Sequence, residues 1–167
     1  RSVLHAFNRW PTWMWANWEI EAFAEWLHSY NGSLPVNKKT GFYGLDVYSL
    51  WESLEAILNY LGKVDPAAKE IAMKAWQCFE PYREEGSDYA RATANPWVPA
   101  SCENEVVDLL KEILYKMQQY NTDHEAVMSA GQNALVAVNA ERYYRAMIQS
   151  GPESWNIRDT HMVDTLE

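Results

Sequence analysis

The sequence predicts a mainly α-helical fold: a bundle-like segment with one short strand, at about residues 41–46, that belongs to a larger α/β fold. Apolar residues recur every three or four positions over most of the chain, which is the period of a helix packed on one face. Gly, Pro and Asn punctuate these stretches at helix-like intervals. A chain of 167 residues is long enough for one hydrophobic core, so we expect a single domain over residues 1–167.

The first half of the chain shows three helical patterns. Pro11 suits the first turn of a helix, and Asn31-Gly32 is a typical helix end. Asp46 is placed to cap a second helix that ends at Gly62, and Asp65-Pro66 opens a third.

The second half begins with an irregular stretch between Pro81 and Pro99. Ser101 restarts an apolar stripe that runs to Met117, and the longest helical pattern covers residues 125–149. A last helix is expected to begin near Glu153, after a Gly-Pro stop.

One short segment is typical of a strand. Residues 41–46 read Gly-Phe-Tyr-Gly-Leu-Asp, and Asp46 follows its apolar side chains. A lone strand cannot satisfy its own backbone donors and acceptors. The segment is therefore either a loop in a helical bundle or a strand whose sheet lies outside this chain. In the second case Asp46 would lie at the carboxyl end of a strand, where ligands gather in open α/β sheets.

Charge excludes two classes of partner. Lys and Arg number 14 against 23 Asp and Glu, for a formal net charge of −9. An acidic chain lacks the basic footprint of a nucleic-acid binder and suits an anionic membrane surface poorly. No apolar stretch reaches the 18 residues of a membrane span, and no signal peptide is read after Arg1. Both ends look cut, so we expect a fragment of a longer chain.

Two cysteines, Cys78 and Cys102, are too few for a disulfide framework, and neither has zinc-ligand spacing. We therefore expect a cytoplasmic protein. Glu25-x-x-His28 matches half of a di-iron helix motif, but the sequence holds no second such pair. No phosphate-binding loop or nucleophile elbow is present either. The sequence thus predicts no metal and no cofactor.

Tryptophan is concentrated near the start of the chain, where Trp13 lies among five Trp within residues 10–26. Such side chains serve either as core filler or as the wall of a cleft, because an indole packs on one edge and meets a ligand or water on the other.

The densest polar cluster lies near the end of the chain, in residues 154–162. Arg158 and His161 are three positions apart and share a helix face. Trp155 precedes them by one turn. A guanidinium beside an imidazole suits the binding of a carboxylate or an oxyanion. The alternative is structural: an ion pair of Arg158 with a nearby acid and a half-buried His161.

Taken together, several segments resemble the erythromycin esterase family. They are Arg-Trp-Pro-Thr-Trp-Met-Trp at 9–15, Trp-Leu-His-Ser-Tyr-Asn at 26–31, Phe-Tyr-Gly-Leu-Asp at 42–46, Asn-Ala-Glu-Arg-Tyr-Tyr at 139–144 and Ser-Trp-Asn-Ile-Arg-Asp-Thr-His-Met at 154–162. These segments occur in family order and span almost the whole chain. Members of the family are longer and place a sheet around a catalytic cleft.

The resemblance implies metal-independent hydrolysis of an ester or lactone, with a histidine base that activates water. That histidine belongs to a Gly-Glu-x-x-His motif, and further histidines belong to an Ala-His-Asn-x-His motif; this sequence has neither. The resemblance places one active-site position here, the arginine of Arg-Asp-x-x-Met, which is Arg158. Asp46 is a cleft residue by position, and relatives vary at the position of His161.

Three functions remain open. In the first, the chain is the central segment of an esterase-like hydrolase that binds a small ester or lactone, with Trp13, Asp46, Trp155 and Arg158 lining the cleft. This hypothesis predicts that the isolated chain is inactive. In the second, it is a stand-alone helical binding module with a Trp-lined groove for an apolar ligand or partner. In the third, it is a structural piece that forms a homodimer through the surface left by a missing sheet.

Overall fold

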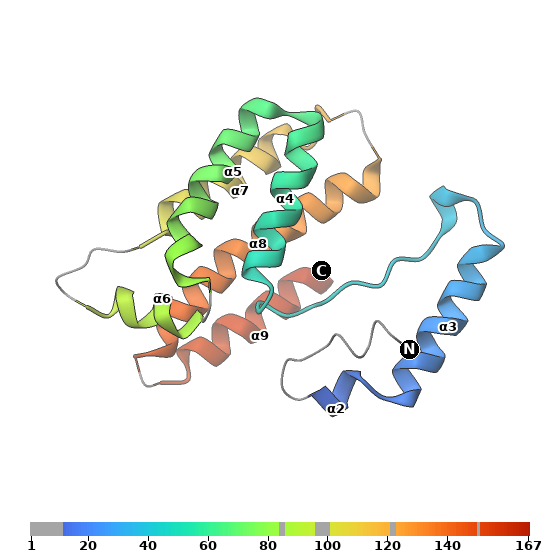
Figure 1. Ribbon diagram of the computed structural model, residues 1–167, viewed down its shortest axis with the longest axis horizontal. Helices are drawn as coiled ribbons and strands as arrows, with labels where there is room; N and C mark the ends of the chain where they lie inside the picture. Colours follow the sequence, from blue (N-terminus) through green and yellow to red (C-terminus); the bar gives the residue numbers. More distant parts are fainter. Residues whose placement is uncertain (1–11, 84–85, 96–100, 121–122, 150) are drawn as a thin grey trace. The chain divides into compact units, whose positions relative to one another are not determined.

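The computed structural model describes residues 12–83, 86–95, 101–120, 123–149 and 151–167 (Figure 1). Its described part is mainly α-helical, which confirms the predicted fold class. The chain divides into two compact units, Arg1–Gly44 and Leu45–Glu167. The single domain expected over residues 1–167 stays a prediction.

The first unit contains α2 (Thr12–Trp15), α3 (Trp18–Gly32) and a short 3-10 helix, η1 (Val36–Lys38). Where the sequence pattern predicts one helix, Asn17 separates two. Its side chain accepts a hydrogen bond from the backbone N–H of Ile20 at 2.9 Å and donates one to the carbonyl of Met14 at 2.8 Å. This is the usual behaviour of an N-cap residue, which satisfies the free N–H groups of a new helix.

Few side chains are buried within the first unit. Among its described residues only Leu27 is buried, and the aromatic side chains of α3 remain largely exposed. Phe23 packs against Trp26 and against Phe42, and Trp26 stacks on Tyr30. Stacked rings on the surface replace a closed core in this unit.

The second unit holds the core. Its elements are α4 (Leu50–Val64), α5 (Pro66–Phe79), η2 (Glu80–Tyr82), α6 (Gly86–Thr93), α7 (Glu103–Lys116), α8 (His124–Met147) and α9 (Glu153–Leu166). The long helix α8, orange in Figure 1, packs against α4, α6, α7 and α9, while α5 packs against α4 and α7. Helix α8 therefore contacts most of the unit and positions side chains on several of its neighbours.

Large apolar side chains from four helices meet in this core. Fully buried examples are Leu50, Leu54, Ile57, Leu61, Phe79, Tyr89, Leu109 and Ile113. Helix α8 contributes mainly small residues, among them Ala130, Ala134 and Ala137, which allow neighbouring helices to approach closely. The helical spacing in the sequence predicts this apolar face of α4, α5 and α7.

The strand expected at residues 41–46 is not formed. The structure has irregular backbone from Gly41 to Leu45 and a bend at Asp46, with Phe42 and Tyr43 exposed. A strand needs a neighbouring strand for its hydrogen bonds, and none occurs in the described ranges. The larger α/β fold stays a prediction.

The structure also corrects the expectation for the cysteines. Cys78 at the end of α5 and Cys102 just before α7 form a disulfide, with 5.9 Å between their Cα atoms. Their spacing of 24 residues carries no sequence signal, so the pairing depends on how α5 and α7 pack. Disulfides are rare in reducing compartments, so the cysteines no longer support the cytoplasmic location, which stays a prediction.

No helix in the described part of the chain has the length and apolarity needed to cross a membrane. Within the same residues, no group of three or more His, Cys, Asp or Glu side chains lies close enough together to hold a metal ion.

Candidate functional site

Two of the predicted site residues meet directly. Asp46 lies shortly before α4, and Arg158 lies in the second turn of α9, 112 residues later. The Arg158 Nε donates to Asp46 Oδ1 at 2.9 Å and to Oδ2 at 3.1 Å, while Nη2 donates to Oδ2 at 2.7 Å. The bidentate contact fixes the guanidinium plane relative to α4.

Two aromatic rings flank the same guanidinium. The Arg158 Cζ atom lies 5.3 Å from the centre of the Tyr48 ring and 5.5 Å from that of Trp155. Both distances fit cation–π contacts. Tyr48 is held in turn by Tyr143 of α8, because their hydroxyls lie 3.2 Å apart and their rings pack edge to face.

The electrostatics of the site follow from this contact. The hydrogen bonds that Arg158 donates to Asp46 are the main cause that raises the pKa of Arg158 above its usual value, so the guanidinium stays charged. Burial raises the pKa of Tyr143, which keeps its hydroxyl protonated. Arg158 and Asp46 together carry no net charge, so the site offers directed donors rather than a free cation.

The orientation of Arg158 leaves part of its donor set unused. A guanidinium has five N–H groups, and Asp46 engages the Nε and Nη2 edge. Among the described residues, none accepts a hydrogen bond from Nη1. The Arg158 side chain is 24% exposed, so its remaining N–H groups can donate to an oxyanion or carboxylate from solution.

The third predicted residue, His161, is buried rather than half-buried. Its side chain lies against α8, where Asn139 Nδ2 is 2.9 Å from His161 Nδ1. Burial lowers the pKa of His161, and the carboxylates of Asp46 and Asp164 oppose this shift. The imidazole is therefore neutral near pH 7.

The two predicted tryptophans differ in their relation to this site. Trp155 contacts Arg158 and is 59% exposed, and its predicted role as a cleft wall stays a prediction. Trp13 lies in α2 of the first unit and is 68% exposed. Its predicted role in the same cleft stays a prediction.

A separate cavity of about 690 Å³ lies between α5 and α7. Charged and polar side chains line most of it, with Lys74, Glu105, Asp108 and Lys111 among them. It includes none of the predicted site residues and no Trp. This cavity is therefore unlike the groove of the proposed binding module.

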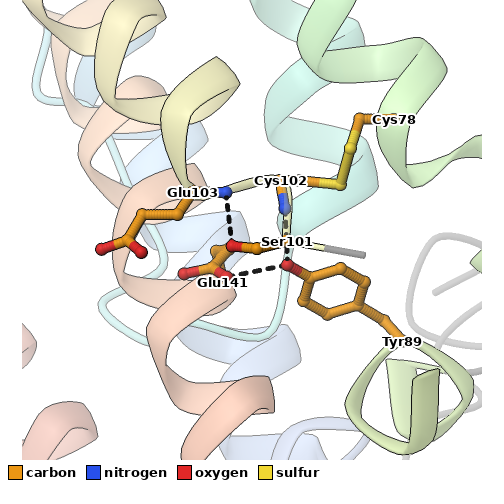
Figure 2. Close-up of a disulfide and its surroundings, with 6 residues drawn as sticks. All are labelled: Cys78, Tyr89, Ser101, Cys102, Glu103 and Glu141. Carbon is orange, nitrogen blue, oxygen red and sulfur yellow. Dashed lines mark hydrogen bonds between the residues drawn. A yellow bond between two sulfur atoms is a disulfide. The ribbon is translucent and has the colours of Figure 1, made fainter. Parts of the chain in front are cut away.

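A second polar cluster is buried beside the disulfide (Figure 2). The Tyr89 hydroxyl accepts a hydrogen bond from the backbone N–H of Cys102 at 2.9 Å and donates one to Glu141 Oε1 at 2.7 Å. Arg145 bridges the other oxygen of Glu141 to Glu103. Burial raises the pKa of Glu141, whereas its hydrogen bonds with Tyr89 and Arg145 lower it. The cluster ties α6, α7 and α8 together.

Sequence reasoning missed the residues that support the site: Tyr48, Asn139 and Tyr143. Tyr48 lies two residues after Asp46, which is a weak signal. Asn139 and Tyr143 are four residues apart on one face of α8, and both belong to a segment that carries the family resemblance. A polar pair at this spacing on a mostly apolar helix is the signal that could have identified them.

Comparison with known proteins agrees with the resemblance read from the sequence. No solved structure matches the chain. The model of the family described as erythromycin esterase matches residues 1–167, which is the whole chain. The segments that contain Asp46 and Arg158 both lie within that match. The chain therefore belongs to the erythromycin esterase family.

Proposed function

We propose that this chain forms the anion-binding part of the active site of a hydrolase that cleaves a carboxylic ester or lactone. Membership of the erythromycin esterase family supports the reaction class. Fold and family alone do not define a reaction, so the residues must supply the chemistry. The observation that carries the proposal is that Asp46 engages one edge of the Arg158 guanidinium, while the rings of Tyr48 and Trp155 both lie within cation–π distance of it.

Ester cleavage places negative charge on the former carbonyl oxygen in the transition state. Donors that are already oriented toward this oxygen stabilise the charge without reorganising. In the proposed role, the outer N–H groups of Arg158 donate to that oxygen. Asp46 and the two rings serve as positioning residues that prevent the guanidinium from rotating.

The proposal assigns proton transfer to residues outside this chain. A general base needs a suitable pKa and hydrogen-bond reach to water. The sequence lacks both histidine motifs that the resemblance associates with the base, and His161 is buried against Asn139. We therefore expect the isolated chain to cleave no ester, and the longer parent protein to supply the base.

The test compares two arginine variants in the natural full-length protein. Arg158→Lys keeps a positive charge but removes the fork that binds Asp46. Arg83→Lys is the matched control, because Arg83 also lies over an aromatic ring, 5.3 Å from Trp76, and is not part of this site. Substrates are a macrolide lactone and a series of activated aryl esters.

We expect Arg158→Lys to lower kcat/KM by about 10²–10³, which is typical for the loss of one oxyanion donor. Arg83→Lys should leave kcat/KM within about threefold, and circular dichroism should show that both variants are folded. Equal activities of the two variants would refute the role of Arg158. Cleavage by the isolated chain, lost on replacing one of its own histidines, would refute the assignment of the base.

A further inference from the structure

The pairing of Asn139 with His161 determines which ring nitrogen of the histidine carries a proton. Asn139 lies in the middle of α8 and is 9% exposed, whereas His161 lies in α9 and is 1% exposed. Helices α8 and α9 pack together, and the pair joins them at 2.9 Å between Asn139 Nδ2 and His161 Nδ1. Bulk water cannot replace a hydrogen bond at this depth, so its polarity is fixed by the two side chains.

An amide nitrogen can only donate a hydrogen bond. Asn139 Nδ2 therefore requires a lone pair on His161 Nδ1. In a neutral imidazole one nitrogen is the donor and the other the acceptor, so the proton is on Nε2. The hydrogen bond that Nδ1 accepts thus determines that Nε2 carries the proton and can donate.

The surrounding charges are consistent with a neutral ring. Burial opposes the charged form of His161, and the carboxylates that act on it are Asp46, before α4, and Asp164, on α9 itself. From α8 the partner is the uncharged Asn139. A carboxylate in that position would favour the imidazolium, whereas an amide does not.

We propose that Asn139 is a positioning residue that holds His161 as the neutral Nε2–H tautomer. In this tautomer the Nδ1 lone pair of His161 is engaged by Asn139, so the ring does not act as a base. The tautomer is a property of the resting protein and is independent of the proposed function.

Nitrogen NMR of the full chain, labelled with ¹⁵N-histidine, reads the tautomer directly. Protonated and unprotonated ring nitrogens have distinct shifts, and couplings to the ring protons identify Nδ1 and Nε2. His161→Gln assigns the signal, and the exposed His124 serves as the internal control for a ring that exchanges between tautomers. We expect an unprotonated Nδ1 and a protonated Nε2 for His161 near pH 7.

Asn139→Asp reverses the polarity of the bond with almost no change in shape. A carboxylate can only accept, so the proton should move to His161 Nδ1, and the pKa of His161 should rise. Asn139→Leu removes the bond and should leave a mixture of tautomers. A protonated Nδ1 in the unmodified chain would overturn the proposal, even where a variant fails to fold. Loss or retention of ester cleavage in Arg158 variants bears on the proposed function alone.

Discussion

Replacing Cys78 with Ala removes the covalent link between the end of α5 and the start of α7. The two cysteines are 24 residues apart, so the disulfide closes a loop that contains α6. The loop-entropy relation assigns about 3.5 kcal/mol to a loop of about 25 residues at 25 °C. The Cα separation of 5.9 Å lies in the ordinary range, so the bond requires no displacement of the helices. We therefore expect the variant to lose about 3.5 kcal/mol of unfolding free energy.

Urea unfolding followed by circular dichroism measures this loss. With an m-value of about 2 kcal/mol/M, the midpoint should fall by about 1.7 M. Ala is chosen because Cys78 is partly buried and Cys102 fully buried, so a polar replacement would add a solvation cost. Adding dithiothreitol to the unmodified chain should reproduce the variant, and adding it to the variant should change nothing.

Thiol titration tests whether Cys78 and Cys102 form the disulfide on which this prediction depends. The unmodified chain should show no free thiol under denaturing conditions without reductant, because the structure pairs both cysteines. Two free thiols would show that the bond does not form. A midpoint shift below about 0.3 M, with the bond present, would refute the loop-entropy argument instead.

Two further substitutions test one partly buried and one fully buried carboxyl group. Asp65→Ala should lower the free energy of unfolding by about 1–2 kcal/mol, because Asp65 caps α5 by accepting a hydrogen bond from the Ala68 N–H at 3.0 Å. Urea midpoints measure this loss, and Asp108→Ala, at an exposed position, is the control. The same hydrogen bond from the Ala68 N–H is the largest of several causes that lower the pKa of Asp65. The ionised Asp65 therefore adds to the free energy of unfolding above about pH 3.8, and this addition is lost as the pH falls further. Burial raises the pKa of Glu141. The protonated Glu141 therefore adds to the free energy of unfolding below about pH 4.5, and this addition is lost as the pH rises. Glu141→Gln should flatten this decline when the free energy of unfolding is measured as a function of pH. An unchanged slope would show that burial of Glu141 does not cause the decline.

The helices could be predicted because their signals are local. Helix α5 opens at Asp65-Pro66 and the last helix begins at Glu153 as expected, whereas α4 ends at Val64, two residues after the expected end at Gly62. Each of these boundaries depends on capping and apolar spacing within a few residues. The break at Asn17 is also local, but a helical pattern on both sides conceals it.

The site was predictable only in part, because its contacts join distant segments. The motif resemblance marks Asp46 and Arg158 separately, whereas their bidentate contact depends on how α9 packs near the start of α4. The strand at 41–46 was one of two alternatives for a short apolar segment, and such a segment does not itself supply a neighbouring strand. The disulfide depends in the same way on tertiary packing.

Helix α8 shows how one segment serves two clusters. Asn139 and Tyr143 are four residues apart and face the site, where they contact His161 and Tyr48. Residues two positions later in each case, Glu141 and Arg145, are rotated by about 200° and contact α6 and α7 beside the disulfide. A shift of α8 would therefore disturb both clusters together. The alternation of Asn, Glu, Tyr and Arg at 139–145 has a physical reason: one rigid helix must satisfy polar partners on opposite faces.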